Sequence, residues 1–333
     1  MRPPGFWNSA EPSLAAYALS PFAAIYAAAT ARRVARPANY NPCAPVICVG
    51  NINAGGTGKT PTVLALTALI SDGGLRTAIV SRGHGGALKG PIQVDPARHD
   101  ASDVGDEPLL MSAFAPVVIS RNRAAGTELA DQIGADVIVM DDGHQNPDIA
   151  KTLSLVVVDA SVGFGNGRVI PAGPLREPVT TGLDRADALL SIGGSDAQSQ
   201  FQARWGDRIG IPHLTAHLAP LPTGMQLREL RAVAFAGIGR PEKFFDTLRA
   251  EGVELLRTVP LGDHQPLTPA LMRRLAHEAE ALGAQLITTE KDAVRLPNDV
   301  RRKVITVPVR LQFDVPEAIT QVLAPVLAQR TAP

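Results

Sequence analysis

The sequence predicts an α/β protein in which a doubly wound, mainly parallel sheet is followed by a second, smaller α/β domain and preceded by helices. Short runs rich in β-branched residues occur at 116–120, 135–140 and 153–159. A helical pattern at 123–133 separates the first two runs. Continuous apolar runs of this kind are typical of parallel strands that are covered on both faces. We therefore expect ligands to bind at the carboxyl ends of these strands.

Composition bounds the size and the partners of the protein. With 333 residues, 45% of them hydrophobic, the chain is long enough for about two globular domains. Lysine plus arginine and aspartate plus glutamate both number 32, so the formal net charge is zero and no global field attracts nucleic acid. Cys43 and Cys48 have no partners at the spacing of a zinc site or a disulfide framework, which fits a reducing cytosolic compartment.

We expect a domain boundary near 220–224, where two prolines and a glycine interrupt the chain. Residues 41–220 then form the first α/β domain. Residues 225–333 form the smaller one, which starts afresh with an apolar strand at 231–237 and has another at 286–289.

Residues 1–40 form an N-terminal helical segment with an uncharged, alanine-rich stretch at 12–31. Pro21 and two serines interrupt this stretch, which argues against a helix that spans a membrane. Glu11 precedes the apolar part and three arginines follow it, which argues against a signal peptide. Two interpretations stay open: helices that lie in the membrane interface, with the arginines near anionic headgroups, or helices that pack on the core of the domain. The arginines are Arg32, Arg33 and Arg36.

A glycine-rich loop follows the apolar run at 46–50 and ends in Gly58-Lys59-Thr60. This pattern matches a phosphate-binding loop (P-loop) except that Asn53 replaces the first glycine. Since asparagine tolerates left-handed backbone better than most residues, a phosphate-binding loop is plausible with Asn53 at this position. Lys59 would neutralise the outer phosphates of a nucleotide and the Thr60 hydroxyl would hold a magnesium ion.

A glycine-rich turn without a ligand is the alternative interpretation of this loop. The helical pattern at 61–70, which would point its positive end at the phosphates, favours nucleotide binding instead. We expect the nucleotide to contact the whole segment, which consists of Asn53, Ala54, Gly55, Gly56, Thr57, Gly58, Lys59 and Thr60.

Asp141 and Asp142 directly follow an apolar strand. A carboxylate at the end of a buried strand, beside a phosphate-binding loop, can hold magnesium directly or through water. The alternative is that one of the two only caps the next turn. We expect at least one of them to serve the metal.

Three further segments are weaker candidates when each is taken alone. The acidic loop at 100–107 is typical of helix capping. His264, in the loop at 261–266, could act as an acid, as a base or as the partner of a carboxylate, but a surface histidine explains it as well. Arg176 and Glu177 lie in a proline-rich loop, where Arg176 could bind phosphate oxygens or only form an exposed pair with Glu177.

Taken together, a series of short strings resembles the tetraacyldisaccharide 4'-kinases, the lipid A 4'-kinases of Gram-negative bacteria. Their order and spacing agree over nearly the whole chain. The strings are Val49-Gly-Asn-Ile-Asn-Ala-Gly-Gly-Thr-Gly-Lys-Thr-Pro61, Ser81-Arg-Gly83, Gly105-Asp-Glu-Pro108, Asp141-Asp-Gly-His-Gln145, Pro171-Ala-Gly-Pro-Leu-Arg-Glu177, Phe235-Ala-Gly-Ile-Gly239 and Thr289-Glu-Lys-Asp292.

The resemblance implies an ATP- and Mg²⁺-dependent lipid kinase with a P-loop NTPase-like fold. It implies a peripheral, monomeric enzyme on the cytoplasmic side of the bacterial inner membrane, where N-terminal interface helices approach a membrane-embedded lipid A disaccharide precursor. The γ-phosphate would go to the 4'-hydroxyl of tetraacyldisaccharide 1-phosphate, forming lipid IVA in lipid A biosynthesis.

The resemblance also implies roles for single residues. Asp106 would help to deprotonate the sugar hydroxyl, with His264 holding that carboxylate and Lys59 stabilising the transferring phosphoryl group. Asp103 is the alternative to Asp106. The substrate-binding residues would be Gln145, Asn146, Arg176 and Glu177, and the metal would be held by Thr60, Asp141 and Asp142.

The chain departs from the family pattern at two positions. Asn146 stands where many members have a histidine, and it can form hydrogen bonds but cannot carry charge. Gln265 replaces the second histidine of a common Asp-His-His string, which leaves His264 alone to complete the catalytic pair. Rival interpretations are a soluble kinase of a small polar metabolite, a nucleotide-driven switch that phosphorylates nothing, and a binding module without turnover.

Overall fold

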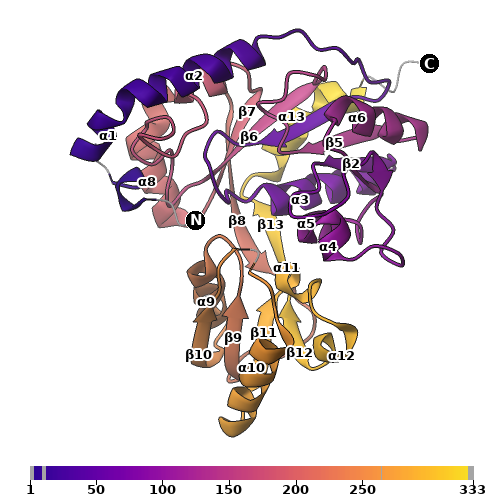
Figure 1. The fold of residues 1–333 in the computed structure, drawn as a ribbon, viewed down its shortest axis with the longest axis vertical. Helices are drawn as coiled ribbons and strands as arrows, with labels where there is room; N and C mark the ends of the chain where they lie inside the picture. Colours follow the sequence, from indigo (N-terminus) through magenta and orange to yellow (C-terminus); the bar gives the residue numbers. More distant parts are fainter. Residues whose placement is uncertain (1–3, 10–12, 264, 329–333) are drawn as a thin grey trace.

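The computed structural model describes residues 4–9, 13–263 and 265–328, which form two sheets with their helices (Figure 1). The larger sheet has nine strands in the order β13-β8-β7-β6-β1-β5-β2-β4-β3. Its inner strands pair in parallel, whereas β13 and β3 pair antiparallel with β8 and β4 at the two edges. The strands are β1 (Val46–Gly50), β2 (Thr77–Ser81), β3 (Ile92–Gln93), β4 (Val117–Ile119), β5 (Val137–Asp141), β6 (Leu153–Asp159), β7 (Ala188–Ile192), β8 (His213–Pro220) and β13 (Val309–Phe313).

Helices cover both faces of this sheet, so the predicted doubly wound fold is confirmed. Alternate residues of one strand serve opposite cores: Ile47 packs in a cluster with Leu66 of α3, whereas Val46 packs in a cluster with Ala130 of α6. The helices are α3 (Lys59–Asp72), α4 (Ala101–Val104), α5 (Asp106–Met111), α6 (Arg123–Gln132), α7 (Val179–Leu183), α8 (Ser195–Trp205), the 3-10 turns η1 (Gly5–Trp7) and η2 (Gly206–Arg208), and α13 (Pro316–Ala328).

The smaller domain is a four-stranded parallel sheet in the order β10-β9-β11-β12. Phe235 of its central strand packs with Leu275 of α10, and Phe245 of α9 lies in the cluster on the other face. The elements are β9 (Arg231–Ala236), α9 (Pro241–Ala250), β10 (Glu254–Pro260), α10 (Pro269–Ala281), β11 (Gln285–Thr289), α11 (Glu290–Ala293), α12 (Asn298–Arg301) and β12 (Val304–Val307).

The smaller domain ends earlier in the chain than the expected range of 225–333. After β12 the chain returns to the larger sheet through β13, and α13 packs on that sheet. The physical reason is burial, because Leu311, Ile319 and Leu323 complete the hydrophobic core of the large domain. The antiparallel pair β8 and β13 therefore joins the two domains (Figure 1).

The N-terminal helices α1 (Leu14–Ala18) and α2 (Ser20–Val34) lie across the large domain, at the end remote from the smaller domain (Figure 1). Ala16, Ala23 and Thr30, which recur every seven residues, form their buried side. Ala23 packs in the core cluster that contains Phe164. No helix of the described residues is long and apolar enough to cross a membrane.

Candidate functional site

The glycine-rich loop leaves the fully buried strand β1 and runs directly into helix α3. Gly58, the residue before the helix, has a φ of 94°, which favours glycine. A side chain there would also meet Ile192, because a Cβ atom would lie 2.5 Å from its Cδ1. Lys59 and Thr60 begin the helix at the carboxyl edge of the sheet, and their backbone N–H groups are available to an anion.

Asn53 does not adopt the left-handed backbone that asparagine tolerates. Positive φ angles outside glycine occur, among the described residues, at Asp142 and Glu229. The Asn53 amide instead donates a hydrogen bond to the Gly163 carbonyl, at 3.0 Å, in the interior. The loop is further held by the Ala54 N–H, which donates to the Pro174 carbonyl at 2.7 Å. Asn53 thus attaches the loop to the body of the domain.

Asp141 lies at the carboxyl end of β5 and is paired in register with Val49 of β1. Its side chain is buried, and its Oδ2 accepts a hydrogen bond from the Ser81 hydroxyl at 3.0 Å. Its Oδ1 is buried without a hydrogen-bond partner. Burial, aided by the charge of Glu107, raises the pKa of Asp141 to about 6. A buried, unpaired carboxylate oxygen is unfavourable unless it receives a ligand.

Asp142 pairs with two cations, Lys59 of the loop and Arg176. Its Oδ1 lies 3.5 Å from the Lys59 Nζ and accepts a hydrogen bond from the Arg176 guanidinium at 2.9 Å. Although burial acts to raise it, Lys59 and Arg176 lower the pKa of Asp142 to about 2. Its φ of 53° turns the chain directly after Asp141. The two aspartates therefore differ: Asp142 is ion-paired, and Asp141 is buried with one open oxygen.

Magnesium, which the kinase interpretation requires, suits this donor set. The ion usually takes one or two carboxylates and keeps several waters or phosphate oxygens. Asp141 Oδ1 supplies an open acceptor, and Thr60 supplies a hydroxyl at the start of α3. No cluster of three or more histidine, cysteine or acidic side chains suitable for a metal occurs among the described residues.

Gln145 connects the loop to a buried carboxylate. Its amide donates to the Asn51 carbonyl at 2.8 Å and to Glu177 at 2.9 Å, and its oxygen accepts from Arg176 at 3.2 Å. Glu177 is buried and also pairs with Arg185. The alternative of an exposed pair between Arg176 and Glu177 is therefore wrong, because Arg176 pairs with Asp142 and the buried Glu177 pairs with Arg185.

Asn146 is turned away from this network. Its amide donates to Asp148 at 3.2 Å, and its oxygen accepts from the Asp148 N–H at 2.9 Å. It lines a separate polar hollow with Lys151 and Arg185. His144 is also structural: it is buried, its Nε2 lies 2.8 Å from the Gly182 carbonyl, and burial lowers its pKa to about 4.

The expected acidic loop at 100–107 contains two short helices, α4 and α5. Asp100 caps α4 by accepting from Ser102 N–H, and Asp103 reciprocates by accepting from the Asp100 N–H at 3.0 Å, as a capping box does. Asp106 starts α5 and is buried, with its Oδ1 accepting from the Glu107 N–H at 3.0 Å. Capping of α4 thus explains Asp103, whereas it does not explain why the Asp106 carboxylate is buried.

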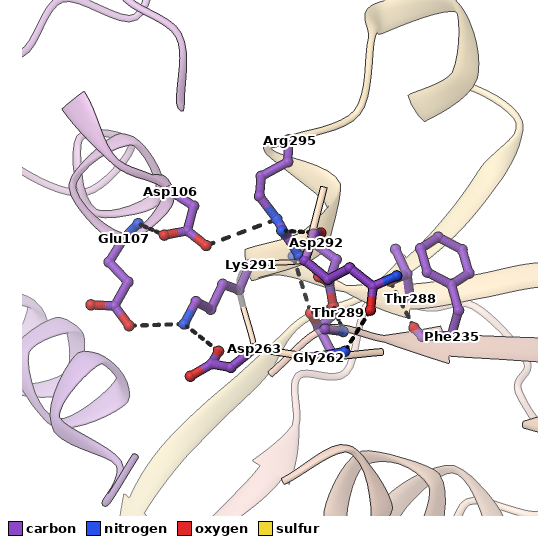
Figure 2. A network of polar contacts seen from close by, with 12 residues as sticks. Asp106, Glu107, Phe235, Gly262, Asp263, Thr288, Thr289, Lys291, Asp292 and Arg295 are labelled. Carbon is purple, nitrogen blue, oxygen red and sulfur yellow. Dashed lines mark hydrogen bonds and ion pairs between the residues drawn. The ribbon is translucent and has the colours of Figure 1, made fainter. Parts of the chain in front are cut away.

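Two cations of the smaller domain face Asp106 and Glu107 (Figure 2). The Arg295 Nε lies 3.8 Å from Asp106 Oδ2, and the Lys291 Nζ lies 3.0 Å from Glu107 Oε1. We did not predict a role for either cation, although Lys291 belongs to a family string. His264, the predicted partner of Asp106, lies outside the described residues.

A cavity of about 290 Å³ lies between the domains, with its floor at the glycine-rich loop. Apolar side chains from both domains line it, including Leu64, Phe244 and Val307. At its edge, Asp159 of the large domain binds Arg240 at 2.8 Å and Lys243 at 2.6 Å. Apolar walls above a phosphate-binding loop can hold a nucleotide base. The cavity is also lined by Gly56, Thr57, Gly58, Lys59, Thr60, Glu107 and Lys291.

Known proteins are similar to this chain over nearly its whole length. A family model described as tetraacyldisaccharide-1-P 4'-kinase matches residues 15–328. The tetraacyldisaccharide 4'-kinase of Dinoroseobacter shibae is 60% identical, over 97% of each chain. That of Jannaschia sp. is 55% identical, over 94% of this chain and 95% of its own. The structure of LpxK from Aquifex aeolicus in complex with ATP is 25% identical with a TM-score of 0.73, over 93% of this chain and 99% of its own.

We expect Asn53→Gly, which restores the consensus residue of the loop, to lower the free energy of unfolding by about 1–2 kcal/mol. The change removes a buried hydrogen bond and leaves the Gly163 carbonyl unpaired. Urea unfolding followed by circular dichroism measures it. Asn39→Gly, at an exposed loop position, is the control and should cost less. Equal losses in the two variants would show that the Asn53 side chain does not hold the loop.

Proposed function

Since the chain belongs to the tetraacyldisaccharide-1-P 4'-kinase family, we propose that its interdomain site transfers the γ-phosphate of ATP to the 4'-hydroxyl of a tetraacyldisaccharide 1-phosphate. The product is lipid IVA, and the reaction belongs to lipid A biosynthesis. The observation that carries the proposal is the cavity that contains the P-loop residues and Glu107 of the large domain together with Lys291 of the smaller one.

Lys59 and the first turn of α3 bind the nucleotide phosphates in this mechanism. When nucleotide enters, Lys59 exchanges its contact with Asp142 for the phosphate oxygens and stabilises the charge of the transferring group. Magnesium, held by Thr60, Asp141 and Asp142, would neutralise further charge on the phosphates. The base of ATP would lie against the apolar walls of the cavity, which include Phe244.

Asp106 is the proposed base. Its carboxylate takes the proton of the acceptor hydroxyl while the hydroxyl oxygen bonds to the γ-phosphorus. The bond from that phosphorus to the bridging oxygen breaks at the same time, and ADP leaves. His264 is proposed to hold Asp106. Because Asp106 and His264 belong to different domains, the mechanism requires the two domains to be in contact.

Arg176, Gln145 and Glu177 are proposed to bind the sugar and its substituents. They form a continuous network beside Asp142 and the loop, so a polar acceptor bound there would lie next to the phosphates. Asn146 remains a proposed substrate ligand from the sequence. Its contacts with Asp148 direct it to the separate hollow lined by Lys151 and Arg185, so it would reach a more distant part of the substrate.

The N-terminal helices are proposed to rest on the cytoplasmic side of the inner membrane, where they would meet the acylated substrate as part of a monomeric, peripheral enzyme. Their buried side is narrow, whereas large apolar side chains point outward: Leu14 is 89% exposed, Ile25 69% and Phe22 61%. An exposed apolar face of this kind marks an interaction surface. Arg32, Arg33 and Arg36 follow it and would lie near anionic headgroups.

The first test is transfer of labelled γ-phosphate from ATP and magnesium to a tetraacyldisaccharide 1-phosphate in detergent micelles. We expect wild-type protein to label the lipid, and Lys59→Ala to lower kcat/KM by at least about 100-fold because it removes charge stabilisation from the transition state. ATP binding or hydrolysis without labelled lipid would contradict the lipid kinase and favour a nucleotide-driven switch or a kinase of a soluble metabolite.

Asp106→Ala should lower kcat by about 100-fold or more, since it removes the general base, while ATP affinity stays close to that of the wild type. Asp103→Ala is the matched control, because it removes an aspartate of the same segment that only caps α4. Single-turnover kinetics with bound ATP separate chemistry from binding. Near-wild-type turnover of Asp106→Ala together with loss in Asp103→Ala would reverse the assignment.

Phe22→Ser combined with Ile25→Ser should weaken binding to vesicles of anionic phospholipid by about 10-fold or more. The reason is that burial of each apolar side chain in the membrane would contribute about 1.5 kcal/mol or more to the binding free energy. The control is Leu282→Ser, an exposed leucine of the smaller domain. Vesicle sedimentation gives the bound fraction. Unchanged sedimentation of the double variant would argue against the membrane contact of this face.

A further inference from the structure

The turn at Thr289–Asp292 is fixed inside the smaller domain. Asp292 is fully buried, and its Oδ2 accepts hydrogen bonds from the Gly237 N–H at 2.9 Å and from the Thr289 hydroxyl at 2.8 Å. The Thr289 hydroxyl oxygen in turn accepts from the Asp292 N–H at 3.1 Å, which caps α11. A buried carboxylate with several hydrogen bonds gives the turn one defined conformation. The side chains that leave this turn therefore start from a rigid base.

Arg295 extends from this base to the large domain. Its Nη2 binds Asp292 Oδ1, and its Nη1 donates to the Gln265 carbonyl at 2.8 Å, so both ends of the guanidinium are held within the smaller domain. The side chain is 11% exposed, and its Nε is buried without a hydrogen-bond partner. This Nε is the atom that lies 3.8 Å from Asp106 Oδ2 (Figure 2).

Lys291 makes a second bridge beside the first. Its Nζ lies 3.0 Å from Glu107 Oε1 of the large domain and 3.4 Å from Asp263 Oδ1 of its own domain. Although burial acts to lower it, Glu107, Asp106 and Asp263 raise the pKa of Lys291. The side chain is 16% exposed. It therefore stays charged in a site that excludes most water, where an ion pair is stronger than at the surface.

We propose that Arg295 and Lys291 are positioning residues that orient the Asp106–Glu107 segment for phosphoryl transfer when the two domains are in contact. The proposal rests on the proposed function, because it takes Asp106 as the base. It gives the Thr289-Glu-Lys-Asp292 string a role: the string anchors Arg295 and supplies Lys291.

Geometry and charge both support this role. Asp106 is 4% exposed, and a buried carboxylate needs a nearby positive charge to remain ionised and able to accept a proton. The Asp106 Oδ1 is already directed by the Glu107 N–H, so a cation near Oδ2 fixes the second oxygen. Arginine suits this task because it stays protonated and does not compete for the proton of the substrate.

Because Arg295 is anchored in the smaller domain, its contact with Asp106 depends on the relative position of the two domains. Arg295 cannot follow Asp106 if the domains separate, because its Nη atoms are bound to Asp292 and to the Gln265 carbonyl. Misplacement of a catalytic group by about 1 Å can cost on the order of 100-fold in rate. Loss of either bridge should therefore reduce turnover with little effect on nucleotide binding.

The test measures kcat for lipid phosphorylation and, separately, the Kd for ATP by calorimetry. We expect Arg295→Gln to lower kcat by about 10- to 100-fold with a Kd for ATP within about twofold of wild type, and Arg295→Lys to recover part of the loss because it keeps the charge. Arg249→Gln, which breaks an exposed ion pair with Asp246, is the control and should change neither quantity by more than about twofold.

Exchanging the charges of Lys291 and Glu107 tests the same proposal without relying on the Arg295 variants to fold. Lys291→Glu and Glu107→Lys should each lower kcat, and the double variant should be more active than either single one. Two results would overturn the positioning role alone, provided that wild-type protein is active. One is an Arg295→Gln variant with the same kcat as wild type, and the other is a double variant that is no more active than the less active single variant. No lipid product from wild-type protein would overturn the proposed function and the positioning role with it.

Discussion

The two-stranded connection between the domains is the constraint on which the rest of the structure depends. β8 carries the chain out of the large sheet and β13 brings it back, paired antiparallel from Val309 opposite Pro220 to Phe313 opposite Ala216. Hydrogen bonds along this ribbon hold the smaller domain over the carboxyl edge of the large sheet, where the P-loop lies. Neither domain alone contains the cavity, since its walls come from both.

Ionic contacts flank the cavity and define the relation of the domains more closely. Asp159 binds Arg240 and Lys243 on one side, and Glu107 binds Lys291 on the other, so carboxylates of the large domain face cations of the smaller one. Partly buried ion pairs of this kind contribute little net stability, because desolvation offsets their attraction. These ion pairs instead favour one relative orientation of the domains, since a displaced domain would leave charges unpaired. A polyanionic nucleotide entering between them would find cations from both domains.

The N-terminal helices pack on the core of the large domain, which is one of the two interpretations that the sequence left open, and they also expose an apolar face. A narrow stripe of small side chains, Ala16, Ala23 and Thr30, lets the helices lie close to the large domain. The larger apolar residues Leu14, Phe22 and Ile25 remain mostly exposed. Packing by small residues fixes the orientation of the helices, and that orientation decides which side chains are presented outward. This apolar face lies on the same domain as the network of Gln145, Arg176 and Glu177, which is proposed to bind the sugar.

The sequence by itself determined the features that depend on local pattern: apolar strands covered on both faces, the glycine-rich loop before a helix, and Asp141 and Asp142 at the end of a strand. Tertiary structure alone decided contacts between distant segments. It bound Asn53 to Gly163, returned β13 to the large sheet, and brought Lys291 to Glu107 across a separation of 184 residues. Local propensity acts over a few neighbouring residues, whereas such pairings are selected by burial and charge once the whole chain has folded.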